Sequence, residues 1–188
     1  MCGIWGFDVS KSGMWDEDFV EDMIKRADER GGHSYGFYGI KANGEHIYFK
    51  EEGRARPLLI MELIKDCVVV IGQSRLATSG GIDLFNAQPL VTKDYAIVHN
   101  GNIENYKAIM EYYKYRPTTE LDTEALVPVM RSGDEINVKG SYLALKLEEY
   151  EWVLKYYTHG LPLVQARIEL APDVINEYFC SKEWRIQS

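Results

Sequence analysis

The most constraining feature of this sequence is its beginning, where a cysteine directly follows the first methionine. The run from Gly3 to Val9 that comes next is short and apolar, which favours a buried strand. If Met1 is removed, Cys2 becomes the first residue. It then carries a thiol nucleophile and a base, its own α-amino group, with a pKa of about 7.7–8.0. The alternative is that Cys2 is only a small buried residue opening a strand. The beginning of the chain therefore predicts a catalytic cysteine or a purely structural one.

Composition limits the class of protein. The 188 residues are enough for one domain with a substantial core. The 21 basic and 29 acidic residues give a formal charge of −8, so we expect no nucleic-acid or membrane partner. The three cysteines, at positions 2, 67 and 180, lack the spacing of a disulfide framework or a zinc site, and we expect no metal or cofactor. We find no leader and no apolar run of membrane-spanning length, so we expect a cytoplasmic protein.

Hydrophobic patterning predicts an α+β layered fold. The expected strands cover residues 3–9, 35–41, 45–50, 68–72, 90–92, 95–99, 141–147, 152–158, 163–169 and 174–180. The expected helices begin near Asp16 and Pro57, run from 106 to about 115, and begin again near Asp122. Runs of strands separated by pairs of helices favour this fold class over alternating βαβ units. Because we find no repeat and no linker, we expect a single domain over residues 1–188.

Several polar residues come at the ends of expected strands, and each has two interpretations. Arg75 forms either a structural ion pair or a grip on a substrate carboxylate. Asn100 and Gly101 form either a simple turn or a pair of oxyanion donors, one side-chain amide and one backbone N–H. Asp122 either caps a helix or pairs with a substrate ammonium group. Attack of a thiolate on the carboxamide of a free amino acid requires all of these functions, so the set favours the catalytic interpretation.

The order of these motifs resembles the glutaminase domain of the class II, or N-terminal nucleophile, glutamine amidotransferases. The resemblance covers nearly the whole chain, to about Cys180. Some stretches are similar to the glucosamine-6-phosphate synthase branch of that family and others to the phosphoribosylpyrophosphate amidotransferase branch. The matching segments are residues 1–6, 30–36, 74–78, 86–89, 99–105, 122–124 and 160–163.

The resemblance implies a fold and a set of site residues. The fold is a four-layer αββα sandwich, the N-terminal nucleophile hydrolase fold, with Cys2 at the end of a central strand. Cys2 is then the nucleophile, and Asn100 with Gly101 forms the oxyanion hole. The residues implied for substrate binding are Arg75 and Asp122, which would hold the α-carboxylate and α-ammonium groups, Thr78 and Ser79, which would line the pocket, and Arg30, which would orient the site.

Two departures from the family pattern concern the wall of the pocket. His33 stands where the family usually has an acidic residue. Leu76 and Ser79 stand where the glucosamine-6-phosphate synthase branch has tryptophan and histidine. These positions do not carry the chemistry. We expect His33 and His99 to be satisfied loop or core histidines.

The expected function is hydrolysis of L-glutamine to glutamate and ammonia through a thioester on Cys2. Family members usually carry a second domain that consumes the ammonia. The 188 residues leave no segment for a synthase domain, so we expect a separate ammonia-accepting synthase subunit. Two alternatives stay open: hydrolysis of another γ-glutamyl amide or peptide, and a non-catalytic regulatory subunit. The complete residue set argues against the regulatory subunit, because a decayed site is expected to lose Cys2, Asn100 or Asp122.

Overall fold

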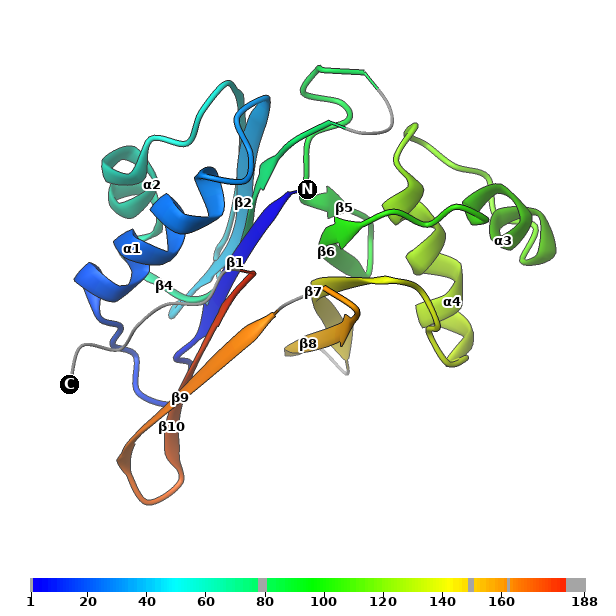
Figure 1. The fold of residues 1–188 in the computed structure, drawn as a ribbon. Coiled ribbons are helices and arrows are strands. Elements are labelled where there is room, and N and C mark those ends of the chain that lie inside the picture. The colour runs from blue at the N-terminus through cyan, green and yellow to red at the C-terminus, as the bar shows by residue number, and fades with distance from the viewer. Residues whose placement is uncertain (1, 78–80, 149–150, 162, 182–188) are drawn as a thin grey trace.

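Two antiparallel sheets are stacked face to face in the middle of the molecule, and helices cover the outer face of each (Figure 1). The computed structural model describes residues 2–77, 81–148, 151–161 and 163–181. The layers follow the order helices, sheet, sheet, helices, with a separate apolar core at each of the three boundaries. The predicted α+β class and four-layer αββα sandwich are therefore confirmed.

The first sheet has six strands in the order β3-β2-β4-β1-β10-β9. The strand bounds are β1 Gly3–Asp8, β2 Ser34–Lys41, β3 His46–Glu52, β4 Cys67–Arg75, β9 Val164–Ala171 and β10 Val174–Cys180. β1 lies between β4 and β10 and pairs with both. Because successive side chains of a strand point to opposite faces, Ile4 packs against the second sheet and Trp5 packs into the core under the helices.

The second sheet has four strands in the order β5-β6-β7-β8. The strand bounds are β5 Leu90–Val91, β6 Tyr95–Gly101, β7 Gly140–Glu148 and β8 Glu151–His159. Branched apolar side chains fill the space between the two sheets, with Ile4 and Ile71 from the first sheet against Val98 and Leu143 from the second. All four are fully buried, and truncating such a side chain to alanine typically costs about 2–5 kcal/mol.

Two helices cover each outer face (Figure 1). The first pair is α1 Glu17–Asp28 and α2 Pro57–Ile64; on the other side are α3 Tyr106–Tyr112, the short 3₁₀ helix η1 Asp122–Ala125 and α4 Leu126–Ser132. The Asp16 carboxylate caps α1 by accepting a hydrogen bond of 2.9 Å from the backbone N–H of Phe19. The apolar residues at three- and four-residue spacing, from Val20 to Ala27, form its buried face, as the pattern predicts.

α1 lies directly against the start of β1. A β-carbon at position 3 would overlap the backbone carbonyl of Ala27, so only glycine allows this approach. The residue that precedes Gly3 is Cys2, and the close packing of helix on strand therefore fixes the backbone next to the cysteine.

Two strands are longer than the sequence predicts, and both carry candidate site residues. β4 continues beyond Gly72 to Arg75, because Ser74 pairs with Gly3 and Arg75 pairs with Ser34. β6 continues through Asn100 to Gly101, where it pairs with β7. The predicted ends of these strands, at residues 72 and 99, are therefore wrong, because both strands include the site residues. Their backbones are held in the sheets themselves.

The helices of the second face also differ from the prediction. α3 ends at Tyr112 and not near 115, because Lys114 adopts a left-handed backbone conformation with φ of 53°. The segment that begins at Asp122 is first a 3₁₀ turn and becomes α-helical only at Leu126. Asp122 therefore stands at the start of a tight turn that faces the end of β6.

Candidate active site

Cys2 precedes β1, at the edge where β1 begins and where β4 and β6 end. The pairing of Gly3 with Ser74 places Cys2 beside the end of β4. Its Sγ donates a long hydrogen bond of 3.6 Å to the carbonyl oxygen of Leu76, and the side chain is half-buried. Burial raises the pKa of the Cys2 thiol, and the positive charge of Arg75 opposes that rise. The thiol is therefore protonated at neutral pH and needs a base in order to attack.

The carboxamide of Asn100 is the clearest sign of a binding function. Asn100 is completely buried, and neither its Oδ1 nor its Nδ2 has a hydrogen-bond partner among the described residues. Buried polar groups are almost always paired, because leaving one unpaired costs folding free energy. An amide that is buried and unpaired at the wall of a cavity is suited to a ligand that supplies the missing partner.

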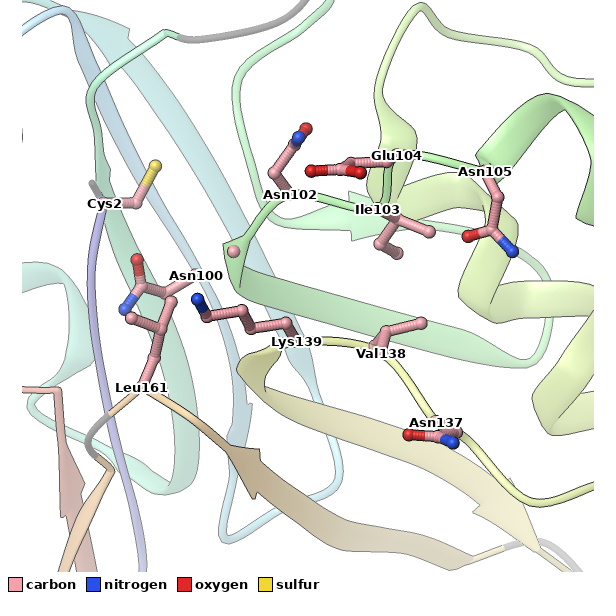
Figure 2. A pocket seen from close by; sticks show the side chains of 11 residues that line it. Cys2, Asn100, Asn102, Ile103, Glu104, Asn105, Asn137, Val138, Lys139 and Leu161 are labelled. Atoms are coloured by element: carbon pink, nitrogen blue, oxygen red, sulfur yellow. The ribbon is translucent and has the colours of Figure 1, made fainter.

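Cys2, Asn100 and Gly101 line one cavity of about 710 Å³. Figure 2 shows Cys2 and Asn100 at one end of it and Asn105 and Asn137 at the other. The complete lining is Cys2, Asn100, Gly101, Asn102, Ile103, Glu104, Asn105, Asn137, Val138, Lys139 and Leu161. The structure thus brings together the three residues predicted as catalytic.

Gly101 has no room for a side chain. A β-carbon there would lie 2.6 Å from Nε2 of His99 and 2.7 Å from the carbonyl oxygen of Lys139. Gly140 faces Gly101 across the pair of β6 and β7. The absence of a side chain at Gly101 therefore lets the backbone of β7 lie close to the end of β6. This close approach sets the position of Gly101 in the cavity wall.

Arg75 and Asp122 are not among the residues that line the cavity. Arg75 is 3% exposed, and its Nη1 donates a hydrogen bond of 2.9 Å to the carbonyl oxygen of Gly81. Asp122 is 6% exposed and accepts a hydrogen bond of 2.7 Å from the N–H of Ile103, which does line the cavity. The charge of Arg75 lowers the pKa of the Cys2 thiol and the charge of Asp122 raises it. The two predicted charge-binding residues therefore shift the pKa of the same thiol in opposite directions.

Arg30 takes a supporting position away from the cavity. Its Nη1 donates a hydrogen bond of 2.8 Å to the carbonyl oxygen of Ser181. The hydroxyl of Ser181 in turn accepts a hydrogen bond of 2.9 Å from the N–H of Ile4. Arg30 thus braces the start of β1 through the residue that follows β10.

His33 supports the loop that follows β4. Its Nδ1 accepts a hydrogen bond of 3.0 Å from the N–H of Ala77. Thr78 and Ser79, the two residues predicted to line the pocket, come next in the chain and lie outside the described residues. His33 therefore fixes the backbone of Ala77, the last described residue before Thr78.

Much of the cavity wall could not be identified from the sequence. Leu161 and the segment 137–139 come from connections near β7 and β8, far along the chain from Cys2. Figure 2 shows the amine of Lys139 extending towards Asn100. No motif marks the segment 137–139, and the antiparallel pairing of β6 with β7 brings it to the site. Leu161, in contrast, lies in the matching segment 160–163.

Metal ligands and membrane segments were also sought in the part of the chain that the structure describes. It holds no group of three or more His, Cys, Asp or Glu side chains arranged to bind a metal ion. None of its helices combines the length and the apolar character needed to cross a membrane.

Comparison with known proteins agrees with this geometry. Residues 74–145 match a family described as a glutamine amidotransferase domain. Two curated relatives are glutamine–fructose-6-phosphate aminotransferases (isomerizing). The one from Bacillus cereus is 34% identical over 139 residues, and the one from Corynebacterium glutamicum is 32% identical over 142 residues. The chain contains a class II glutamine amidotransferase domain. The predicted family is thereby confirmed.

The matches place this amidotransferase domain within longer relatives. Each alignment covers 69% of the chain but only 22% of the relative. Among solved structures, the glutamine phosphoribosylpyrophosphate amidotransferase from B. subtilis, complexed with ADP and GMP, has a TM-score of 0.65 at 19% identity. The structure of the allosteric regulatory enzyme of purine biosynthesis has a TM-score of 0.67 at 20% identity. Both cover 96% of this chain and 42% of their own, and they share its fold, the N-terminal nucleophile hydrolase fold.

Proposed function

We propose that this amidotransferase domain hydrolyses L-glutamine to glutamate and ammonia, with Cys2 as the nucleophile. The observation that carries the proposal is the buried, unpaired carboxamide of Asn100 in the same cavity wall as the thiol. Acyl transfer from a carboxamide creates a tetrahedral oxyanion, and donors fixed in advance are the usual means of stabilising it. Asn100 Nδ2 and the backbone N–H of Gly101 are the proposed donors.

The reaction begins at the thiol. Once Met1 is removed, the free α-amino group of Cys2 takes the thiol proton, and Sγ forms a bond to the γ-carbonyl carbon. The raised thiol pKa makes this base necessary near neutral pH. The C–N bond then breaks, and ammonia leaves with the proton returned by the α-ammonium group. Water hydrolyses the thioester and releases glutamate.

The remaining site residues receive proposed roles in holding the substrate. Arg75 pairs with the α-carboxylate and Asp122 with the α-ammonium group, which suits their opposite charges near the thiol. Thr78 and Ser79 line the pocket. Arg30 orients the site through Ser181, without contact to the substrate.

The test is substitution of the nucleophile. Cys2→Ala and Cys2→Ser should each abolish glutamine hydrolysis and leave the fold intact. Cys67→Ala is the matched control, because Cys67 is a buried cysteine at the other end of β4 and should tolerate the change. Glutaminase activity close to that of the unmodified protein in Cys2→Ala would disprove the proposed mechanism.

A second candidate is hydrolysis of a larger γ-glutamyl amide or peptide. It is favoured by the volume of the cavity, about 710 Å³, which lies in the range of pockets that hold ligands larger than a free amino acid. A panel of γ-glutamyl peptides decides between the two substrates. Higher kcat/KM for a peptide than for glutamine would establish the second candidate.

We also propose that the ammonia passes to a separate synthase subunit. The support is that the curated relatives are aminotransferases named for an acceptor, fructose 6-phosphate. Affinity purification of the native protein should recover a synthase-type enzyme, and its addition should raise glutaminase kcat/KM. Full activity without a copurifying partner would contradict this. The cytoplasmic location stays a prediction.

A further inference from the structure

A buried hydrogen-bond network lies beneath the proposed active site. Its members are Gln73 on β4, Gln88 in the segment before β5, His99 on β6 and Thr123 in η1, with exposed fractions of 1%, 4%, 2% and 0%. None of the four is among the residues that line the cavity. They were expected to be structural or were given no role.

Gln88 is the centre of this network. Its Oε1 accepts hydrogen bonds of 2.7 Å from the backbone N–H of His99 and 2.9 Å from Nε2 of Gln73. Its Nε2 donates one of 2.9 Å to Oγ1 of Thr123. Gln73 Nε2 also donates one of 2.6 Å to the carbonyl oxygen of His99. Three elements from distant parts of the chain are thereby joined through one side chain.

The directions of these hydrogen bonds determine which ring nitrogen of His99 carries its proton. Because Thr123 Oγ1 already accepts from Gln88, its own hydroxyl proton is free to be donated to Nδ1 of His99, 3.3 Å away. His99 then carries its proton on Nε2. Burial lowers the pKa of His99, although the charge of Asp122 opposes this, and a neutral imidazole fits the acceptor role.

Each member stands next to a proposed site residue. His99 directly precedes Asn100, and Thr123 directly follows Asp122. Gln73 lies two residues before Arg75 on β4, and alternate residues of a strand share a face. We propose that Gln73, Gln88, His99 and Thr123 are positioning residues that hold Asn100, Asp122 and Arg75 in mutual alignment. This inference rests on the proposed function, because those three residues are its oxyanion and charge-binding groups.

Stability alone does not account for the network. Gln73 Oε1 and His99 Nε2 have no hydrogen-bond partner among the described residues, although both are buried. A polar cluster with unpaired atoms generally stabilises a core less than apolar side chains of similar size do. Directional hydrogen bonds, unlike apolar packing, fix the distance and the orientation between β4, β6 and η1.

The experiment compares Thr123→Val with Thr123→Ser. Valine keeps the volume but removes the hydroxyl, so β6 and η1 lose their link. We expect kcat for glutamine to fall by about tenfold to a hundredfold, the effect of a small displacement of reacting groups, with KM changed less than about threefold. Serine keeps the hydroxyl and should restore kcat. If Thr123→Val fails to fold, Thr123→Ala takes its place, since a water molecule can occupy the space.

Thr92→Val is the matched control. Thr92 lies just before the other end of β6, where its hydroxyl accepts a hydrogen bond of 3.0 Å from the N–H of Tyr95. This variant also loses a threonine hydroxyl on the same sheet but should keep the kcat of the unmodified protein. Alkylation of Cys2 by iodoacetamide forms no oxyanion, so its rate should be unchanged in all of these variants. Equal kcat in Thr123→Val and Thr92→Val would overturn the proposal, as would failure of serine to restore activity.

A readout without substrate separates this proposal from the glutaminase assignment. The side-chain amide signals of Asn100 in nitrogen-15 NMR spectra should shift in Thr123→Val and stay in place in Thr92→Val. Unmoved Asn100 signals would overturn the positioning role. Absence of glutamine hydrolysis in the unmodified protein would instead overturn the proposed function, and the NMR comparison would still decide the role of Thr123.

Discussion

At the level of single residues, the proposed oxyanion donor Asn100 has a cost in folding free energy. Its carboxamide is completely buried and both of its polar atoms are unpaired. An unsatisfied buried group typically costs about 1–3 kcal/mol of folding free energy. A buried oxyanion donor has this cost because a donor already hydrogen-bonded within the protein could not donate to the oxyanion that forms in the transition state.

Asn100→Ala should therefore separate activity from stability. We expect kcat to fall by about 10²–10³-fold, the usual effect of losing one oxyanion donor, with a smaller change in KM. The free energy of unfolding should not fall and should rise by up to about 1–3 kcal/mol, since no hydrogen bond is lost and the unpaired amide is removed. Steady-state kinetics and urea denaturation measure the two effects. A change confined to KM would make Asn100 a binding residue.

The charges of Arg75 and Asp122 lead to a prediction about substrates. Glutamine analogues that lack the α-carboxylate, or that are acylated on the α-nitrogen, should be poorer substrates by at least about 10²-fold in kcat/KM. Each analogue lacks one of the two charged groups that Arg75 and Asp122 are proposed to bind. Hydrolysis of N-acylglutamine as fast as glutamine would assign the domain to the acylases or peptidases.

At the scale of elements, η1 is fastened by Glu124. This carboxylate is completely buried and accepts hydrogen bonds of 2.7–2.9 Å from the backbone N–H and hydroxyl groups of Thr118 and Thr119. Tyr115 donates a further one of 3.1 Å. Burial alone would raise the pKa of Glu124, but these hydrogen bonds hold it below its ordinary value of 4.5. The turn that carries Asp122 is thus anchored to the loop after α3.

Glu124→Gln should loosen this anchor. Only one oxygen of the glutamine can accept, so we expect the free energy of unfolding at pH 7 to fall by about 2–3 kcal/mol. A carboxyl with a lowered pKa in the folded state contributes its full stabilisation above the ordinary pKa of 4.5. It loses this contribution as the pH falls from there through the lower pKa of the folded state. Urea denaturation at pH 7 and pH 4 should show a weaker pH dependence in the variant. An unchanged dependence would rule out this role of Glu124.

Secondary structure could be predicted because its signals are local. The amphipathic spacing from Val20 to Ala27 gave the buried face of α1, and Pro57 marked the start of α2. The ends of β4 and β6 were predicted too early, since polar residues such as Arg75 and Asn100 resemble loop residues in a single sequence. Their place in the strands depends on pairing partners that a local pattern does not reveal.

At the scale of the whole molecule, the family resemblance supplied what local patterns could not. It predicted the αββα sandwich and named Cys2, Asn100 and Gly101, which line one cavity. It did not predict the Gln88 network or the segment 137–139. Both arise from contacts between elements that are distant along the chain. Gln88, His99 and Thr123 lie in the matching segments, but the motifs do not show that their side chains meet. Seen along the chain, Gln88 is one polar residue before a proline; in the fold it joins three elements.

The central claim is that Cys2, freed of Met1, forms a thioester with the γ-glutamyl group of glutamine. Rapid mixing with glutamine, acid quenching and mass spectrometry of the intact protein test it most directly. The predicted result is a chain without Met1 that gains the mass of one γ-glutamyl group, located by fragmentation on Cys2 and absent in Cys2→Ala. An adduct on another residue, or glutamine turnover by a protein that keeps Met1, would contradict the account.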